Sequence, residues 1–448
     1  MVQKTNSSIF IICTLGVLLP TIGFAQPTRS GDREWNKNKA ILLNTPEAGF
    51  IVRLGDIDNF GFGWPENFDP YCDGITESHQ GPYKPSATEA AGTDRVLFST
   101  QFNPLSKQAC GKDEAAKSFV ATNNTAPFFK FNLDSLNHTP VRYAELQCFA
   151  EDIQTKSRCS KFSMTINGKN YPEGEALLND LEMSPGMGKL IHFPLTPDMC
   201  EALAREAQFT VKFDERTGAG DAYAIDFIRI LGNPFTERMC RFSVKGVVLE
   251  EGTEAPLPGA IVSCWGGSQG TTNSKGEFTL DNIPGGVHYL TISRKGYFDS
   301  GKSVEVNRMT GEPLSINLKP GKRELLFMGR NIASGENVVC RKTRFVPVKN
   351  VLEEGSTDEL GYLSNMMKQM PEMELVLEGH SELNGDPFIL KQTSWKKAMA
   401  CKEFIMARGI DGSRIRVYGY GNERPLVKEG KPEELKSNDR IEFRISRL

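Results

Sequence analysis

The chain lacks several features that define large protein classes. Its 448 residues have a formal net charge of only −3, which excludes the strong positive field of a general nucleic-acid binder. It has 5 histidines and no CxxC pair, so ligand spacing predicts no zinc site. The HExxH and dinucleotide-binding glycine motifs are also absent. We therefore expect neither an enzyme nor a nucleic-acid partner.

The first 25 residues have the composition of a secretory signal peptide. Lys4 is the only charge among them, an apolar stretch runs from Ile9 to Phe24, and Ala25 supplies a small residue for cleavage. No later apolar run reaches the length of a membrane-spanning helix, so we expect no transmembrane segment in the mature chain. These features predict export to the periplasm.

Export changes what the cysteines indicate. Nine of the 10 cysteines follow residue 25, and six lie between Cys72 and Cys240, a density that predicts disulfides in an oxidising compartment. Cys148 and Cys159 are close enough in the sequence to join the two arms of a hairpin. An odd total leaves at least one free thiol, for which we favour Cys401.

Residues 30–236 show the period-two alternation that is typical of β-strands. Clear examples are 128–131, 209–213 and 224–230, and Gly, Pro, Asn and Asp punctuate the sequence between them. Helical signal is confined to about 197–206. The pattern predicts an all-β sandwich or jelly roll as the N-terminal domain.

Residues 240–320 contain short alternating strands separated by polar turns. Their order, ending in Arg294-Lys295-Gly296-Tyr297, resembles the carboxypeptidase-regulatory-like domain, a small immunoglobulin- or transthyretin-like β-sandwich. The resemblance implies a spacer or a binding platform. The segments that carry it are 242–249, 256–262, 274–280 and 283–292.

Residues 323–448 change to a mixed helical and strand pattern. The expected order is a strand at 345–348, a helix after a capping box at 356–359, a strand at 374–380, a helix capped by Ser394, and two final strands at 414–421 and 440–445. This order predicts a C-terminal α+β domain whose helices cover a sheet.

Four motifs in this last part resemble the OmpA-like peptidoglycan-binding domain. They occur in the order of that family and extend over about 125 residues. The motifs are Glu378-Gly379-His380-Ser381-Glu382, Ser394-Trp395-Lys396-Lys397-Ala398, the segment Val417 to Pro425, and Asn438-Asp439-Arg440-Ile441-Glu442.

The resemblance implies a pocket for the diaminopimelate side chain of a peptidoglycan stem peptide. The tip of that side chain has both an ammonium and a carboxylate, which the family binds with Asp and Arg. Here those positions are Glu382 and Lys397, which keep both charges and change both shapes. Ser381 and Ser394 complete the predicted peptidoglycan-binding set. The alternative is that Glu382 and Lys397 only pair with each other at the surface.

Three further departures from the family predict a weakened contact. Leu390 stands where the family usually has a ligand-facing Asn, and Thr393 replaces the Leu of a Leu-Ser pair. Asp439 replaces the first of two consecutive Arg residues.

A weaker motif lies in the N-terminal part. Asp56, Asp58 and Asn59 place three oxygen-bearing side chains ahead of Gly61, an arrangement that a calcium ion can use. The alternative is a polar loop that contains Asx turns and no ion.

These observations favour a non-enzymatic protein of the cell envelope. We expect it in the periplasm, associated with the outer membrane and the cell wall, where the C-terminal domain tethers it to peptidoglycan. The β domains then present a surface to an outer-membrane or periplasmic protein. Two alternatives remain: an assembly subunit that makes only protein contacts, and a glycan-binding jelly roll on a wall anchor.

Overall fold

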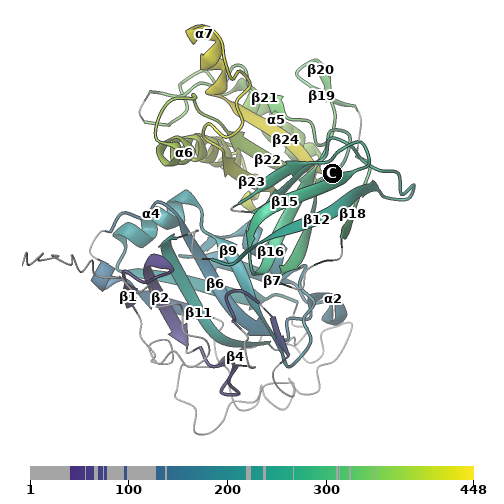
Figure 1. Cartoon of the computed structure of the whole chain (residues 1–448). Helices are drawn as coiled ribbons and strands as arrows, with labels where there is room; N and C mark the ends of the chain where they lie inside the picture. The colour runs from purple at the N-terminus through teal and green to yellow at the C-terminus, as the bar shows by residue number, and fades with distance from the viewer. Residues whose placement is uncertain are drawn as a thin grey trace, which may run out of the picture.

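The computed structural model describes most of the chain after residue 40. The described residues are 41–448 except 56, 65–68, 74, 78–94, 98–127, 137–138, 218–222, 236–238, 266, 309–310, 312, 322–323 and 348. The predicted signal peptide lies outside them. Figure 1 shows three parts in contact, with the C-terminal part in green and yellow above the N-terminal sandwich and the second part in teal and green beside both. Within the described residues, no helix is both long and apolar enough to cross a bilayer.

The N-terminal part is a sandwich of two sheets. The larger sheet has the order β1 (Ile41–Leu43), β2 (Ala48–Gly55), β11 (Tyr223–Pro234), β6 (Ala144–Glu151) and β9 (Met187–Pro194), with β3 (Ile75–Glu77) beside β9 and β4 (Arg95–Leu97) beside β11. The smaller sheet has the order β5 (Phe128–Asn132), β10 (Gln208–Glu215), β7 (Phe162–Ile166) and β8 (Lys169–Asn170).

The alternating residues of these strands build the core between the two sheets. Phe209, Val211 and Phe213 of β10 are buried there, and they face residues of the larger sheet such as Leu146 and Ile230 in one apolar cluster. In the part of the sandwich that the structure describes, three short α-helices close its sides: α2 (Thr155–Arg158), α3 (Pro172–Leu178) and α4 (Pro197–Arg205). Helix α4 is the one that the sequence predicts.

The second part has its own core but shares a sheet with the first. Its three-stranded sheet has the order β15 (Glu277–Pro284), β12 (Arg241–Glu250) and β18 (Leu314–Leu318). Its other strands are β16 (Gly286–Ser293), β13 (Ile261–Cys264), β14 (Gln269–Thr271) and β17 (Ser300–Val306). Strand β16 runs parallel to β9, where Val287 pairs with Ile191, so the larger N-terminal sheet continues into the second part.

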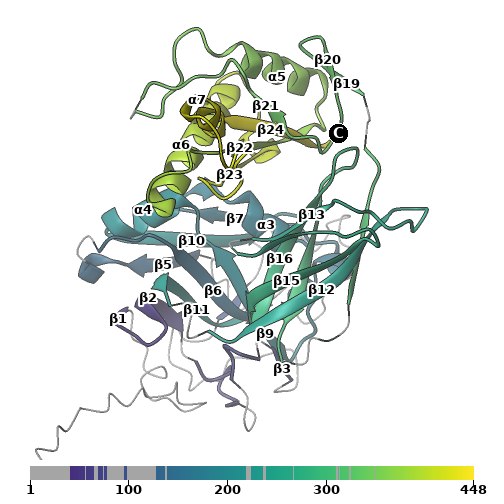
Figure 2. The ribbon, with the colours of Figure 1, turned by 45° about the horizontal axis from the view of Figure 1, so that its top comes forward.

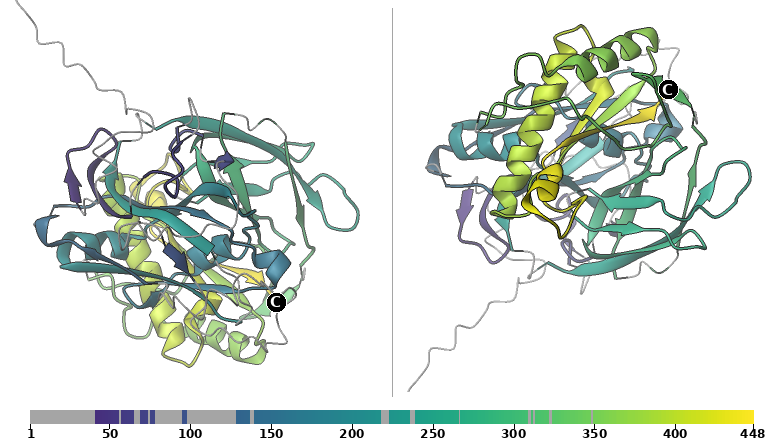
Figure 3. Two further views of the ribbon diagram at one scale, coloured as in Figure 1. Left: turned by 90° about the horizontal axis from the view of Figure 1, so that it is seen from below. Right: turned by 90° about the horizontal axis from the view of Figure 1, so that it is seen from above.

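The C-terminal part is an α+β layer structure. Its elements are the hairpin β19 (Leu325–Phe327) and β20 (Arg330–Ile332), β21 (Val338–Val339), α5 (Asp358–Gln369), β22 (Glu374–Gly379), α6 (Pro387–Met406), β23 (Ile415–Gly419), α7 (Pro432–Leu435) and β24 (Ile441–Arg447). The sheet order is β21-β24-β22-β23. Helices α5 and α6 pack on one face of this sheet (Figure 3), and apolar residues of both helices share a core with the strands.

Two predicted boundaries in this part are wrong. The first strand of the sheet is β21, whereas Phe345 only bridges to Leu352 in a small local hairpin. Helix α6 begins at Pro387, where the Asp386 side chain accepts a hydrogen bond from the Phe388 N–H, so Ser394 lies in its interior. Asp-Pro is a strong helix start, and it lies seven residues before the serine on which the sequence prediction rested.

The cysteine predictions have a mixed outcome. Cys72 and Cys240 form a disulfide with Cα atoms 5.1 Å apart, and Cys159 is also disulfide-bonded. The predicted Cys148–Cys159 pair is wrong, because Cys148 is a free thiol on β6 whose side chain faces the sandwich core. Cys401 is free and buried, as predicted.

A buried histidine connects the first two parts. His192 of β9 pairs with the Glu145 carboxylate through Nδ1, and its Nε2 lies 2.8 Å from the Gly285 carbonyl oxygen of the second part. Both ring nitrogens therefore lie beside acceptor oxygens. Burial alone would raise the pKa of Glu145, but the charge and hydrogen bond of His192 lower it to about 2. The ring of His288 stacks on His192 with centroids 4.3 Å apart.

We predict that His288 makes the fold sensitive to acid. Burial, followed by the charge of His192, lowers the pKa of His288 from 6.5 to about 3. Below pH 6.5 the His288 side chain is therefore protonated in the unfolded chain but not in the folded chain. The stability contributed by neutral His288 is fully present above pH 6.5 and decreases as the pH drops toward 3. Between pH 6.5 and 5 the loss is about 2 kcal/mol.

His288→Gln should remove this part of the pH dependence. The measurement is urea unfolding of both proteins at pH 7, 6 and 5, and the comparison concerns slopes with pH rather than absolute stability. His380 remains in both proteins, so its contribution cancels. Equal slopes for the two proteins would contradict the prediction.

Candidate ligand cleft in the C-terminal part

Helix α6 lies directly on the backbone of two strands. A Cβ at Gly379 would lie 2.0 Å from the Ser394 carbonyl oxygen, and one at Gly419 would lie 2.6 Å from that of Lys391. Only glycine fits such a close approach. The buried face of α6 carries Trp395 and Ala398, among others, which leaves the intervening Lys397 at the side of the helix.

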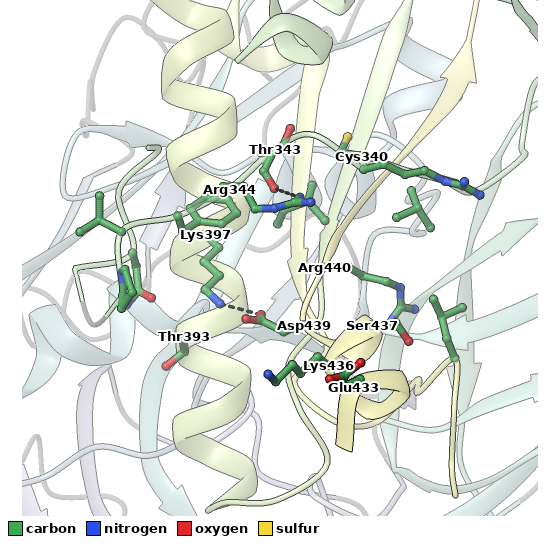
Figure 4. Close-up of a pocket in the computed structure, with 18 residues that line it drawn as sticks. Cys340, Thr343, Arg344, Thr393, Lys397, Glu433, Lys436, Ser437, Asp439 and Arg440 are labelled. Carbon is green, nitrogen blue, oxygen red and sulfur yellow. Dashed lines mark hydrogen bonds and ion pairs between the residues drawn. The ribbon is translucent and has the colours of Figure 1, made fainter. Parts of the chain in front are cut away.

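A cleft of about 1000 Å³ opens beside Lys397 (Figure 4). It lies between α6, the loop after β21, and the segment that leads into β24. Its polar lining residues are Arg341, Thr343, Arg344, Asn350, Thr393, Lys397, Glu433, Lys436, Ser437, Asp439 and Arg440.

Buried polar side chains hold the two loops that line the cleft. The Glu359 carboxylate, at the start of α5, accepts hydrogen bonds from the backbone N–H groups of Arg341, Lys342 and Thr343 at 2.9–3.1 Å. This arrangement replaces the predicted capping box, since Thr357 makes no side-chain cap. On the opposite side, the buried Asn438 accepts from the N–H groups of residues 426 and 427. Both walls of the cleft are therefore fixed before any ligand arrives.

Lys397 points into the cleft and meets Asp439. Its Nζ lies 2.6 Å from Asp439 Oδ1 and 5.7 Å from the centre of the Phe345 ring. Figure 4 shows the two side chains reaching toward each other from opposite walls. The Lys397 side chain is 12% exposed and that of Asp439 39%, so solvent reaches the pair mainly from the carboxylate side.

The other predicted binding residues lie differently. Glu382 is exposed in the loop after β22 and does not line the cleft. Ser381 and Ser394 are buried, and their hydroxyls donate to the carbonyl oxygens of Leu390 and Lys391. The structure thus brings Lys397 and Thr393 to the cleft, uses the two serines to hold α6 against its neighbours, and leaves Glu382 outside.

Three comparisons with known proteins bear on this part and on its neighbour. Residues 244–326 match the family model of the CarboxypepD_reg-like domain. Outer membrane porin F of Pseudomonas aeruginosa is 28% identical over 98 residues, which are 22% of this chain and 28% of the relative. The peptidoglycan-associated lipoprotein of Brucella melitensis is 25% identical over 78 residues, which are 17% of this chain and 46% of the relative.

The chain carries an OmpA-like domain after a CarboxypepD_reg-like domain. Among solved structures, the OmpA-like domain of FopA1 from Francisella tularensis aligns with 12% identity and a TM-score of 0.20, covering 45% of this chain and 93% of that one. The chain spans between about a quarter and a half of the length of the two curated relatives.

The face of the OmpA-like sheet that points away from its helices carries a network of buried charges. Arg444 lies 2.5 Å from Glu378 and 3.0 Å from Asp299, and Arg440 lies 2.6 Å from Glu442. Although burial opposes it, the charges of Arg444 and Arg424 hold the pKa of Glu378 below its ordinary value.

This network also contains a group with metal-ligand chemistry. Ligand atoms of Glu378, His380 and Glu442 lie within 4.8 Å of one another, and burial lowers the pKa of His380 to about 3. The network pairs three carboxylates with the guanidinium groups of Arg424, Arg440 and Arg444. The charges balance without a cation, so we interpret the group as structural.

Asp299 belongs to the CarboxypepD_reg-like domain and joins it to the OmpA-like domain. Its carboxylate binds Arg444, and its N–H donates to the Ser446 carbonyl oxygen at 2.9 Å. The N-terminal sandwich makes a second contact, since Glu201 of α4 lies 2.5 Å from both Lys396 and Gln392 of α6. Figure 2 shows α4 directly below α6. The orientation of the cleft is therefore set by both neighbouring domains.

In the N-terminal part, the residues predicted to bind calcium are partly described. Asp56 lies outside the described residues. Asp58 Oδ1 accepts the Gly61 N–H at 2.8 Å, and the Asn59 amide donates to the Gly63 carbonyl oxygen at 2.7 Å. These are turn contacts of the kind expected in a polar loop. Calcium binding stays a prediction.

Two strings match enzyme motifs by spacing alone. Residues 296–303 have the spacing of a phosphate-binding loop, which needs a helix at its Lys-Ser end. The chain is strand β17 there, and the Ser303 N–H donates to Asp180. Residues 266–270 have the Gly-x-Ser-x-Gly spacing, but Ser268 lies between two strands rather than between a strand and a helix. Neither string forms the site that its motif requires.

We predict that Asp299→Ala destabilises the protein by about 3 kcal/mol, because it leaves the buried Arg444 with less compensation. The matched control is Arg447→Ala, which removes the ion pair between Arg447 and Glu374. The side chain of Arg447 is 67% exposed and that of Glu374 is 34% exposed. The control should cost less than about 1 kcal/mol. Unfolding in urea measures both changes, and equal costs would mean that the domain junction does not depend on Asp299.

Proposed function

We propose that this is a cell-envelope protein that binds peptidoglycan through its OmpA-like domain. The observation that carries the proposal is the cleft with the partly buried Lys397 at its wall. One relative of the domain is named a peptidoglycan-associated lipoprotein. Two of the four OmpA-like motifs contribute to the cleft: the motif on α6 supplies Lys397, and the motif before the last strand supplies Asp439 and Arg440.

The charges of the cleft suit a peptidoglycan stem peptide. Four cationic side chains line it in addition to the internally bonded Arg440: Arg341, Arg344, Lys397 and Lys436. Among the described residues, two carboxylates line it as well, Glu433 and Asp439. A peptide rich in carboxylates gains from this excess, and each charged hydrogen bond contributes roughly 1.5–3 kcal/mol.

We further propose that the protein acts without catalysis, in the periplasm and next to the outer membrane. The two β domains hold the OmpA-like domain in a fixed orientation through Asp299 and Glu201. A wall-bound OmpA-like domain then presents the β-sandwich in one direction, toward an outer-membrane or periplasmic protein.

We predict that Lys397→Met reduces retention of the full chain by purified peptidoglycan sacculi at least tenfold. The physical reason is the loss of one charged hydrogen bond to a ligand carboxylate. Co-sedimentation over a range of sacculus concentrations gives the apparent affinity.

The matched control for this prediction is Lys396→Met. Lys396 is the neighbouring residue on α6, but it contacts Glu201 and does not line the cleft. We expect retention of the Lys396→Met variant to stay within about twofold of the retention of the unsubstituted chain, because only an ordinary surface ion pair is lost. If both variants lose retention equally, general positive charge rather than the cleft binds the wall.

One observation favours a second function. Lys397 already has an acidic partner and Glu382 lies outside the cleft, so the family’s charge pair does not converge here. An OmpA-like domain of this kind could serve as an assembly subunit that contacts only proteins. Absence of sacculus retention, together with stable co-purification in an envelope complex, would support this alternative.

A further inference from the structure

We propose that Asp439, in place of Glu382, binds the ammonium group of the ligand, and that Lys397 and Asp439 together recognise an amino-acid terminus with both charges on one carbon. This inference rests on the proposed function and names the chemistry of its ligand. It follows from the positions of three side chains: Lys397 and Asp439 face each other inside the cleft, and Glu382 lies outside it.

Each member of the pair keeps free bonding capacity. An ammonium has three N–H donors, and Asp439 Oδ1 is the one hydrogen-bond acceptor of Lys397 among the described residues. Over the same residues, Asp439 Oδ2 has no hydrogen-bond partner. The pair therefore leaves two donors and one carboxylate oxygen uncommitted, on two residues that line the same cleft.

A zwitterionic terminus matches these groups. Its carboxylate accepts from Lys397 while its ammonium donates to Asp439, so that the four charges alternate around a ring. The Lys397–Asp439 contact need not break, because each group uses capacity that the pair leaves free. Arg344 is exposed and lines the cleft from the loop after β21, so it is available to bind a further carboxylate of a peptide.

The ring arrangement makes a prediction about specificity. A diamino acid that ends in both charges uses both partners, whereas a lysine side chain lacks the carboxylate for Lys397. A dicarboxylate without amino groups lacks the ammonium for Asp439, and Asp439 then repels it and competes with it for Lys397. The sign of the effect of removing Asp439 should therefore depend on whether the ligand has an amino group.

The test uses the full chain and two soluble ligands of equal carbon length, meso-diaminopimelate and pimelate. Isothermal titration or NMR titration gives the affinity of each ligand for the unsubstituted chain, for Asp439→Asn and for two controls. The controls are Glu433→Gln, which removes another carboxylate from the same cleft, and Glu382→Gln, which removes the residue that the family pattern predicts. Asp439→Glu serves as a rescue variant, and circular dichroism confirms folding.

We expect Asp439→Asn to weaken diaminopimelate binding at least tenfold and to strengthen pimelate binding. Asp439→Glu should restore part of the diaminopimelate affinity, and both controls should stay within about threefold, as for exposed charges. If Asp439→Asn instead strengthens the binding of both ligands, Asp439 merely neutralises Lys397 and the inference is wrong. Loss of diaminopimelate binding in Glu382→Gln, with Asp439→Asn unaffected, would also overturn it.

Sacculus retention separates this inference from the proposed function. If the chain binds sacculi in a Lys397-dependent way but Asp439→Asn changes nothing, the inference fails and wall binding stands. If the unsubstituted chain binds neither sacculi nor diaminopimelate, both fail.

Discussion

The contact of helix α6 with the backbone of β22 and β23 determines the geometry of the OmpA-like domain. Gly379 and Gly419 remove the side chains that would otherwise separate helix and sheet, so the helix settles at backbone distance. Its apolar face then fixes its rotation, and this rotation places Lys397 at the cleft and Lys396 toward the N-terminal sandwich. Two neighbouring lysines thereby acquire different surroundings. Lys397 faces the cleft, and Lys396 joins two domains.

Buried charged and polar side chains join the parts of the chain. Arg444 connects Glu378 within the OmpA-like domain to Asp299 of its neighbour, and His192 connects Glu145 to the Gly285 carbonyl across the other junction. Such groups are costly to bury alone and tolerable only with their partners in place. The junctions are therefore specific in orientation. A rigid arrangement suits the proposed function, in which the OmpA-like domain binds the wall and the β-sandwich is presented in one direction.

Local patterns predicted most of the element types. The alternation in β10 and the helical spacing in α5 and α6 appear in the structure, because each depends on residues close together in the sequence. Boundaries were less predictable. The Ser394 hydroxyl was predicted to cap a helix, but it donates a hydrogen bond to the Lys391 carbonyl oxygen inside α6. The strand predicted at 345–348 is not part of the sheet, where Val338–Val339 pairs with β24 instead. The Cys148–Cys159 pairing failed for a similar reason, since Cys148 lies within β6 with its side chain in the sandwich core, whereas Cys159 follows α2.

The sequence by itself determined that the chain has two β domains followed by an OmpA-like domain, because motif order and hydrophobic period are properties of short segments. It also predicted Lys397 as a binding residue, and the structure places that side chain in the cleft. Only the tertiary structure decided which carboxylate meets that lysine. Asp439 reaches it from the far end of the domain, while Glu382, on the motif that the family uses, stays at the surface. Charge partners across a cleft depend on how loops and helices pack, and no local pattern records that packing.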